Sequence, residues 1–477
     1  MATGKPRASL RNTAGLEGGV ETATDIISRM VALAPPGPTV LSGQIRRVLQ
    51  GLTTRLRARL SDAVEEDLAR FRSTRSRALE LQVEASAAAI RGRRVLVTGG
   101  TGCIGSVLLE RFSRLNPAAL ISVSRGRHPA PLYLPDVDYI FTDVRDAAAI
   151  DQALARARPA VVFHLAAQRD PAKAEREVHE TLTTNILGSC NLIDACRHCG
   201  VERLVFASTG KALRPYTSDV YAASKKACEF IMASGALASD LAIAGARFTH
   251  VVDNSLIERS LEKWILRGKP IRLHDPRAMF YVQCAGEAAD LLLVAASEAP
   301  PRAPALFAIR DLDWPIGLLN LALGVVGECG LPASIHFCGY EDGYEAAPYH
   351  ALYDARLSPS VSPLINAFEA PATVPSRNCA AVDVLPALGA SRTQVAQVGG
   401  LVSLLRERMA APSELRAALN STSWTLLDAQ LRSLPRESIC RLFSRVEEAA
   451  GLAAHPDHVE IDRRIRAALA RPDFGDP

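Results

Sequence analysis

A short apolar segment that runs directly into a cluster of glycines is the feature that most constrains the fold. Residues 93–105 read RRVLVTGGTGCIG, and a helical pattern follows at 106–115. Glycines at such a junction permit a sharp turn, let the backbone approach a pyrophosphate and allow close packing of helix on strand, while the helix N-terminus attracts phosphate. Since strand and helix are both present, the pattern predicts a dinucleotide-binding loop. Its expected cofactor contacts are Gly99, Thr101, Gly102, Cys103, Ile104 and Gly105.

Apolar strands alternate with helices after this loop. Strands are expected at 119–124, 138–141, 160–165, 204–207 and 242–248, and helices at 106–115, 147–157, 185–199 and 221–234. Continuous apolar strands separated by helices are typical of a parallel sheet covered on both faces. The predicted fold class is therefore α/β, with a doubly wound parallel (Rossmann) sheet.

The alternating region is expected to be one of four parts of the chain. The predicted parts are a helical N-terminal extension at 1–90, an NAD(P)-binding Rossmann domain at 91–250, a smaller substrate-binding region interleaved with the end of that domain at 251–384, and a helical C-terminal extension at 385–477.

Both extensions carry helical patterns. Residues 1–38 are expected to be loosely ordered, an apolar stripe at three- and four-residue steps runs from Val40 to Phe71, and a second helical stretch covers 75–89. The arginines opposite the stripe leave two interpretations: a helical hairpin docked on the enzyme body or a second subunit, or a contact with nucleic acid. Further helices are expected at 401–409, 414–419 (with Ser413 as N-cap), 424–434 and 439–449. Contacts in a homodimer are the expected role of the extensions.

Composition places the chain among globular proteins. Of its 477 residues 48% are hydrophobic, and the net charge is only +4, so nothing demands nucleic acid or an anionic membrane as partner. The N-terminus lacks an apolar signal region and no apolar run reaches the roughly 18 residues of a membrane span, which predicts a cytoplasmic protein. The Cys196-x-x-Cys199 pair lacks a second ligand pair, so no metal site and no disulfide framework are expected.

The end of the second strand bears on the choice of cofactor. NAD sites usually place an acidic residue there, whereas an arginine can pair with the 2′-phosphate of NADP. Here Ser124 and Arg125 occupy the position, and no acidic residue occurs between Leu115 and Asp136. The pattern favours NADP over NAD, and the alternative is that Arg125 is a solvated loop cation. Contacts with the adenine edge are expected from Asp143 and Val144.

A Tyr-x-x-x-Lys pattern, Tyr221 to Lys225, lies on one face of the helix after the strand at 204–207. A lysine ammonium near a phenol favours the phenolate and lowers the pKa of the tyrosine from about 10 toward working pH. The tyrosine can then take a proton from a substrate hydroxyl while hydride leaves the same carbon for nicotinamide. The hydroxyls of Ser208 and Thr209 are expected to complete this catalytic site.

These motifs together resemble two nested families. The glycine loop, His164-Leu165-Ala166-Ala167, Thr184-Asn185-x-x-Gly188, Ser208-Thr209 and Tyr221-x-x-x-Lys225 resemble the extended short-chain dehydrogenase/reductase superfamily. Three further features resemble its CapD-like polysaccharide-biosynthesis family of UDP-N-acetylglucosamine 4,6-dehydratases and epimerases. They are Ser124-Arg125, the run STGKALRP at 208–215, and GKPIRLHDP at 268–276 followed by Phe280 and EAADLL at 287–292.

The resemblance implies a nucleotide-diphosphate sugar as substrate and oxidation at C4 of the hexose as the first step. The resulting keto sugar has an acidified C5 proton, so loss of water across C5–C6 or epimerisation at C5 becomes accessible. The implied roles are Tyr221 as base, Lys225 as its tuner and ribose anchor, Thr209 as hydroxyl partner and Lys211 as a further active-site cation. Other cofactor contacts are expected at Leu165, Ala166, Ala167 and Asn185, and substrate contacts at Gln168, His250 and Asn254.

Three positions depart from the family pattern. Gly210 stands where the family has the aspartate that would protonate a departing 6-hydroxyl, His250 replaces an asparagine, and Met279 replaces an arginine. Because glycine cannot donate a proton, the pattern favours epimerisation or simple oxidoreduction over dehydration. His250 either replaces the acid, with a pKa near neutrality, or is a hydrogen-bonded structural histidine.

Two other functions stay open, because a fold does not fix a function. One is oxidoreduction of a non-sugar metabolite, and the other is a cofactor-binding scaffold without turnover. An aromatic and acidic cluster either lines a sugar or nucleobase pocket or forms a surface loop. Its members are Tyr340, Glu341, Asp342, Tyr344, Tyr349, Tyr353 and Asp354.

Overall fold

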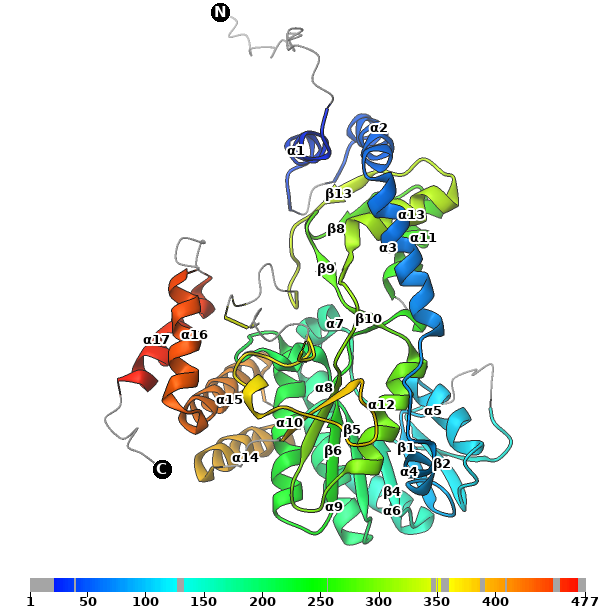
Figure 1. The fold of residues 1–477 in the computed structure, drawn as a ribbon, viewed down its shortest axis with the longest axis vertical. Helices are drawn as coiled ribbons and strands as arrows, with labels where there is room; N and C mark the ends of the chain where they lie inside the picture. Colours follow the sequence, from blue (N-terminus) through cyan, green and yellow to red (C-terminus); the bar gives the residue numbers. More distant parts are fainter. Residues whose placement is uncertain are drawn as a thin grey trace, which may run out of the picture.

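The computed structural model describes residues 21–37, 40–126, 133–254, 256–344, 349, 351–352, 360–386, 391–407, 410–448 and 455–470. Figure 1 shows a body built on one large sheet, an upper lobe, and a group of C-terminal helices at the side of the body.

The sheet of the body has nine strands in the order β14-β15-β11-β6-β5-β4-β1-β2-β3. Its strands are β1 (Arg94–Thr98), β2 (Ala119–Ser124), β3 (Val137–Phe141), β4 (Val161–His164), β5 (Arg203–Ala207), β6 (Ala242–Ala246), β11 (Ala305–Ile309), β14 (Val374–Pro375) and β15 (Val382–Pro386). The pairings from β3 to β11 are parallel, and β15 and β14 are added antiparallel. This confirms the predicted doubly wound α/β class.

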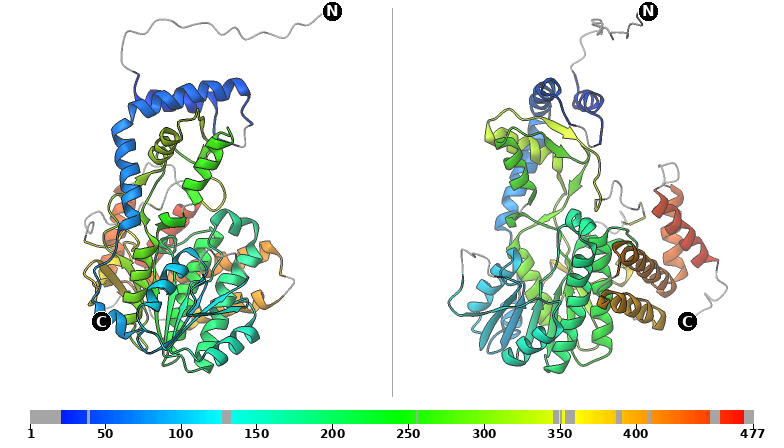
Figure 2. Two further views of the ribbon diagram at one scale, coloured as in Figure 1. Left: turned by 90° about the vertical axis from the view of Figure 1, so that its right-hand side faces the viewer. Right: turned by 180° about the vertical axis from the view of Figure 1, so that it is seen from behind.

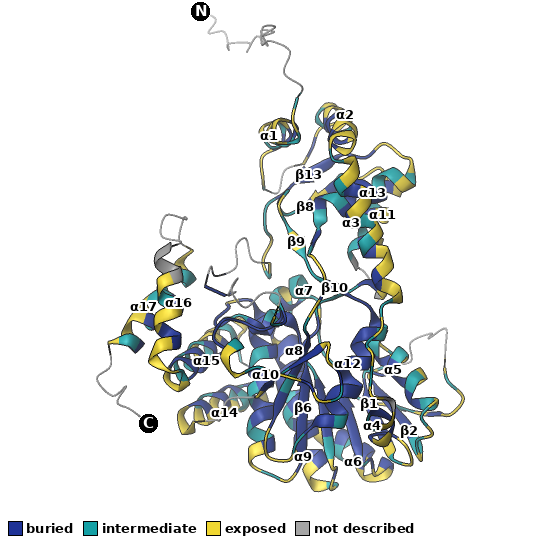
Figure 3. Cartoon of the chain, in the orientation of Figure 1, coloured by how far each residue is buried: buried dark blue, intermediate teal, exposed yellow. Residues whose placement is uncertain are grey.

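Helices cover both faces of the sheet. One face packs against α5 (Cys103–Ser113) and α12 (Ala285–Glu298), and the other against α6 (Ala147–Ala157), α9 (Gly188–His198) and α10 (Val220–Leu237). The central strands β1, β4, β5 and β6 are accordingly almost entirely buried (Figure 3). β6 ends earlier than expected, and a π-helical turn, Thr183–Leu187, precedes α9. The shorter helices are α4 (Val83–Ala88), α7 (Pro171–Arg176), α8 (Val178–Leu182), η1 (Thr74–Ser76), η3 (Gly210–Leu213), η4 (Val252–Asn254) and η5 (Ala370–Ala372).

The upper lobe has a hydrophobic core of its own, to which both the N-terminal helices and the middle of the chain contribute (Figure 2). Its helices are α1 (Ala23–Leu33), α2 (Gly43–Arg59), α3 (Ser61–Ser73), α11 (Leu256–Leu266) and α13 (Leu318–Cys329). Its strand pairs are β8 (Ile271–Leu273) with β13 (Ile335–Phe337), β9 (Met279–Phe280) with β12 (Ile316–Gly317), and β7 (His250–Val251) with β10 (Val282–Gln283).

Two expectations for the N-terminal extension are wrong. Part of the stretch expected to be loosely ordered forms α1, because Thr22 and Asp25 make a capping box and Ile26 packs into the lobe. The long apolar stripe is two helices that meet at Leu60. Of the two interpretations of its arginines, the packing shows helices docked on the same chain, with Arg72 ion-paired to Glu258 of α11, although α2 and α3 run in different directions and do not form a hairpin (Figure 2).

The C-terminal helices are α14 (Arg392–Arg406), α15 (Pro412–Ser433), α16 (Arg436–Glu448) and α17 (Pro456–Leu469). The expected helices at 414–419 and 424–434 are one continuous helix, and α17 was not expected. Ala411 is the N-cap of α15 in place of Ser413, since Pro412 suits the first helical position. The apolar faces of α14 and α15 are buried against α9 and α10, within the chain.

We predict that truncating Leu49 in α2 destabilises the protein much more than truncating its neighbour Val48. Leu49 is fully buried in the core of the upper lobe, whereas Val48 is 45% exposed. Leu49→Ala should cost about 2–5 kcal/mol, whereas Val48→Ala should stay within about 0.5 kcal/mol. Urea denaturation followed by circular dichroism measures both, and equal losses would show that α2 is not packed as described.

Candidate functional site

The predicted cofactor and catalytic residues meet at the carboxyl edge of the sheet. Ligands of open α/β sheets bind outside this edge, at the point where the strand order reverses. The order here reverses between β1 and β4. The glycine loop follows β1, and Thr209 follows β5, next to the start of α10. The edge faces the upper lobe (Figure 1).

The glycine loop is packed so tightly that two of its positions admit only glycine. Gly99 has φ +74°, and a Cβ added there would lie 2.8 Å from the backbone nitrogen of Ala166. A Cβ on Gly105 would lie 2.3 Å from the carbonyl oxygen of Gly99. Gly102 is the N-cap of α5, and a Cβ there would meet only the Gly99 oxygen, at 3.1 Å. The loop therefore presents open backbone at the N-terminus of α5, with Thr101, Cys103 and Ile104 beside it.

The loop after β4 is clamped against the glycine loop and α10. Buried His164 bridges two hydroxyls, with Nδ1 2.8 Å from Thr98 Oγ1 and Nε2 3.1 Å from Ser189 Oγ. Asn185 accepts a hydrogen bond from the backbone of Gln168 and donates one back to its carbonyl. Asn185 also donates to Ser224 of α10. These contacts hold the segment Leu165, Ala166, Ala167 and Gln168 opposite the glycines.

The residues expected beside the adenosine of the cofactor carry local ion pairs. Arg125 donates to Glu180 over 2.9 Å, and both side chains are partly exposed. Asp143 accepts from Arg145; although burial opposes it, this hydrogen bonding lowers the pKa of Asp143. Ser124 is buried at the end of β2 and Val144 packs next to Gly188, so the four predicted residues line the ends of β2 and β3.

Tyr221 and Thr209, the predicted base and its predicted hydroxyl partner, lie close together. Tyr221 lies in the first turn of α10, which Asp219 caps by accepting from the Ala222 N–H at 3.0 Å. The Thr209 side chain lies close enough to Tyr221 for hydrogen bonding to act on the pKa of its phenol. The expected decrease in the pKa of Tyr221 is wrong: burial raises it to about 12, although the hydrogen bond to Thr209 and the charge of Arg169 act in the opposite direction.

The neighbours of this pair explain the correction. Lys225 Nζ donates to the Ala207 carbonyl over 2.6 Å and lies 4.2 Å from the centre of the Phe206 ring. Burial lowers the pKa of Lys225 itself. Ser208, expected to contribute its hydroxyl to the site, donates to the buried carboxylate of Glu229 over 2.6 Å instead. Of the two hydroxyls after β5, only that of Thr209 reaches the tyrosine.

Lys211 contacts one residue of the aromatic cluster, Tyr344, at the edge of the site. Its Nζ lies 3.5 Å from Asp219 Oδ2, donates to the Gly343 carbonyl over 3.2 Å and sits 5.0 Å from the centre of the Tyr344 ring. The rings of Tyr340 and Tyr344 both contact that of His274. Tyr349 lies elsewhere and donates to Asp462 of α17, while Tyr353 and Asp354 lie outside the described residues.

His250, at the start of β7, is buried and lies within reach of a positive charge, that of Arg169. Burial and the charge of Arg169 lower the pKa of His250 to about 4, so the expectation of a value near neutrality is wrong. Its ring contacts Phe280 at 5.3 Å between centroids. Asn254 ends η4, and its side chain lies outside the described part of the structure, whereas Met279 is 60% exposed.

Arg169 is a cation of the site that sequence reasoning missed. Its charge acts on Cys103 of the glycine loop, on Tyr221 and on His250, so it influences residues of both the predicted cofactor side and the predicted substrate side. The available signal was its position directly after Gln168, in the loop that leaves β4 at the sheet edge.

The described part of the chain offers no evident metal site. Among its residues, no group of three or more His, Cys, Asp or Glu side chains is arranged to hold a metal ion. No helix in that part of the chain has the length and apolar character that crossing a membrane requires. His198, inside the Cys196-x-x-Cys199 motif, contacts Asp151, and burial raises the pKa of the Cys196 thiol.

Comparison with known proteins assigns the family. Residues 95–333, about half of the chain, match the polysaccharide biosynthesis protein family. The chain belongs to this family. The match begins in β1 and ends between α13 and β13, so it covers the glycine loop, the predicted catalytic residues and much of the upper lobe. The resemblance expected from the motifs is confirmed.

Individual relatives agree with this assignment. The chain is 26% identical over 268 residues to the probable polysaccharide biosynthesis protein EpsC of Bacillus subtilis, covering 53% of this chain and 44% of that protein. It is 34% identical over 146 residues to a UDP-N-acetylglucosamine 4,6-dehydratase (inverting) of Campylobacter jejuni, covering 29% and 42%. The chain thus spans less than half the length of these relatives. The crystal structure of Pen from Bacillus thuringiensis, 21% identical with a TM-score of 0.52, covers 63% of this chain and 89% of that one and shares the fold.

We predict that the imidazoles of His164 and His250 stay neutral at about pH 5.5. Burial lowers the pKa of His164 to about 3 and that of His250 to about 4, whereas histidines of an unfolded chain titrate near pH 6.5. The unfolded state therefore binds more protons between those values, and stability falls as the pH drops from about 6.5 to 4. Nitrogen-15 NMR of histidine-labelled protein, assigned with His164→Asn and His250→Asn, measures the ring state. Protonation of His250 between about pH 6 and 7 would contradict the described burial.

Proposed function

We propose that this protein is an NADP-dependent oxidoreductase of nucleotide-diphosphate sugars that acts through a transient keto sugar, with Tyr221 as base. The observation that carries the proposal is the placement of Thr209, after β5, close to Tyr221, at the start of α10, at the sheet edge beside the glycine loop. Family membership supports it, as does the local identity to a protein named as a UDP-N-acetylglucosamine 4,6-dehydratase.

The glycine loop fits a dinucleotide. Backbone atoms crowd the positions of Gly99 and Gly105, whereas the face of Gly102 is open at the N-terminus of α5, where an anion is favoured. When bound, the cofactor supplies the hydride acceptor and donor. Lys225, which uses one of its three N–H groups on Ala207, has donors left for a ribose hydroxyl. The other residues proposed to hold it are Thr101, Cys103, Ile104, Ser124, Arg125, Asp143, Val144, Leu165, Ala166, Ala167, Asn185 and Tyr221.

Tyr221 is proposed to move a single proton. When a substrate carbon loses hydride, the proton of the hydroxyl on that carbon passes to the phenolate oxygen of Tyr221, and a carbonyl forms. When the carbonyl is reduced again, the proton returns from Tyr221 to its oxygen. Because burial raises the pKa of the phenol to about 12, the phenolate needs stabilisation from nearby positive charge and hydrogen bonding. Thr209 and Arg169 both act in this direction, and they are the residues proposed to tune the base.

The substrate is proposed to lie between the sheet edge and the upper lobe. Gln168, His250 and Asn254 stay its proposed contacts, and Lys211 with Tyr344 extends them toward the lobe. A neutral His250 does not act as an imidazolium acid at neutral pH, and Gly210 offers no proton. Epimerisation or simple oxidoreduction is therefore proposed ahead of dehydration.

Substituting Tyr221 tests the mechanism. Tyr221→Phe should lower kcat about 10²- to 10⁴-fold, the usual contribution of a positioned proton-transfer group, and Thr209→Val should lower it in the same direction. Tyr139→Phe, a phenol on the distant strand β3, is the matched control and should leave turnover unchanged. The assay uses UDP-N-acetylglucosamine with NADP, and full activity of Tyr221→Phe would disprove the mechanism.

The product of this assay separates the proposed functions. A new stereoisomer of unchanged mass supports epimerisation, and an oxidised sugar with stoichiometric NADPH supports oxidoreduction. Cofactor binding without turnover of any nucleotide sugar would overturn the proposal and favour the scaffold or a non-sugar substrate. A thermal-shift screen of nucleotide sugars detects binding independently of turnover, since a ligand of the native state raises the apparent melting temperature.

Arg125 is proposed to select NADP by exchanging Glu180 for the 2′-phosphate. Arg125→Ala should weaken NADP binding at least about tenfold, since hydrogen bonds to charged groups contribute about 1.5–3 kcal/mol, and leave NAD binding nearly unchanged. Glu180→Gln should strengthen NADP binding, because it removes the carboxylate that competes with the 2′-phosphate for Arg125. Calorimetric titration with both cofactors measures this. Equal effects on NAD and NADP would mean that Arg125 is an ordinary surface cation.

A homodimer stays part of the proposal, with a changed basis. The helical character of the extensions suggested subunit contacts, but the apolar residues of α14 and α15, such as Leu401, Leu405 and Leu415, are buried within the chain. Contacts between two copies would therefore have to use other surfaces.

A further inference from the structure

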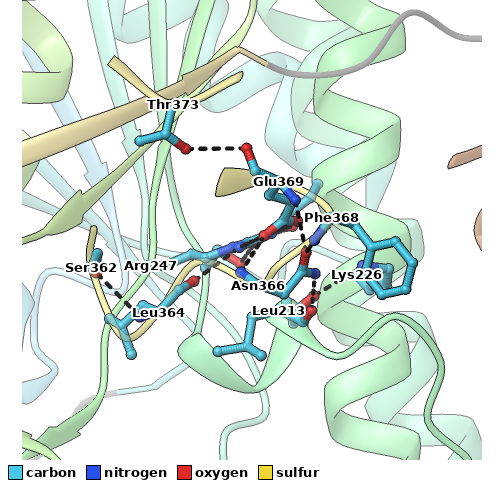
Figure 4. A network of polar contacts seen from close by, with 12 residues as sticks. Leu213, Lys226, Arg247, Ser362, Leu364, Asn366, Phe368, Glu369 and Thr373 are labelled. Carbon is cyan, nitrogen blue, oxygen red and sulfur yellow. Dashed lines mark hydrogen bonds and ion pairs between the residues drawn. The ribbon is translucent and has the colours of Figure 1, made fainter. Parts of the chain in front are cut away.

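A segment far along the chain forms the wall behind the catalytic threonine. Residues 360–373, which precede β14, pass beside the end of β6 and the turn η3 that follows Thr209 (Figure 4). This wall segment contributes buried Ser362, Leu364, Asn366 and Glu369.

The wall segment is held by a completely buried guanidinium. Arg247, just after β6, is 1% exposed, and each of its five N–H groups finds an acceptor. The Nε–H group and one N–H group of Nη2 donate hydrogen bonds to the carboxylate of Glu229 in α10, over 2.9 and 2.8 Å. The others reach both carboxylate oxygens of Glu369, over 2.7 and 2.9 Å, and the Leu364 carbonyl, over 3.0 Å.

A second set of hydrogen bonds ties the wall segment to η3. The Asn366 side chain accepts from the backbone N–H groups of Phe368 and Glu369, both over 2.9 Å, and donates to the Leu213 carbonyl at the end of η3. Lys226 of α10 donates to the Ala212 carbonyl over 3.1 Å. The backbone of Leu364 is thus fixed relative to the turn that contains Gly210.

Leu364 fills the space next to Gly210. A Cβ added to Gly210 would lie 2.7 Å from Leu364 Cδ2 and 3.4 Å from the Phe248 carbonyl, to which the Gly210 N–H already donates. Leu364 is 4% exposed, and its backbone is held on both sides, by the Ser362 hydroxyl and by Arg247. A side chain at position 210 therefore requires the buried Leu364 side chain to move away from its position beside the turn.

We infer that Leu364 is a specificity-determining residue, which keeps position 210 free of a side chain and so excludes a second proton donor beside Thr209. The inference rests on the proposed function for its chemical consequence. On the two sides of Thr209, Ser208 is turned away to Glu229 and Gly210 is covered by Leu364. Tyr221 is then the proton-transfer group at this wall, so hydride and proton are transferred without loss of water, and the product is not lighter than the substrate by one water.

A stability cycle tests the steric part without any substrate. Gly210→Asp and the milder Gly210→Ala should each lower the melting temperature of the wild-type protein. In a Leu364→Ala background, which is itself destabilised by a cavity, the same substitutions should cost much less or raise the melting temperature. Gly399→Ala on α14, where an added Cβ meets nothing within 4 Å, is the matched control and should be additive. Equal costs of the position 210 substitutions in both backgrounds would overturn the inference.

Product mass tests the chemical part. With UDP-N-acetylglucosamine and NADP, the wild-type protein and Leu364→Ala should form products of unchanged or two-hydrogen-shifted mass. The Gly210→Asp/Leu364→Ala double variant should add a product lighter by one water. Dehydration by the wild-type protein, or none by a folded double variant while the wild-type protein turns over, would overturn the inference. Absence of turnover in every variant would instead count against the proposed function, and the stability cycle still judges the role of Leu364.

Discussion

The buried guanidinium of Arg247 is the interaction on which the active edge of the sheet depends. A charge removed from water costs several kcal/mol unless it is partnered, and here Glu229 and Glu369 supply the opposite charges. Although burial opposes it, these carboxylates raise the pKa of Arg247. Losing one partner would leave a buried charge uncompensated, at a cost of about 3–5 kcal/mol. Because Glu229 also holds Ser208, one ion-pair network orders both the strand end and the wall segment.

In the remainder of the site, close contacts between backbone segments set the geometry. Gly99 and Gly105 bring the glycine loop against the loop after β4, and Asn185 ties that loop to α10. The terminal helices take part as well. Trp424 of α15 stacks on Tyr216, which closely follows η3, and Arg416 binds Glu175 of α7. The helical extensions are therefore structural members of the catalytic body and the upper lobe.

Local patterns were sufficient for most of the elements. The strands β1 to β6 and the helices α5, α6 and α10 follow from apolar runs, periodicity and glycines, because each pattern reflects the burial of its own segment. The errors lie at element ends and in the extensions. The capping box of Thr22, the junction of α2 and α3, and the continuity of α15 depend on contacts that apolar spacing does not encode.

The same division applies to the site. Spacing along the chain located the glycine loop, Thr209 and the Tyr221/Lys225 pair, since each motif lies within one strand–loop–helix unit. The direction of the Ser208 hydroxyl, the raised pKa of Tyr221 and the contact of Leu364 with Gly210 all arise where distant segments meet. Burial and long-range packing set these properties. Solvent exclusion and steric contact depend on which distant segments pack over a residue, and the sequence next to that residue does not specify those segments.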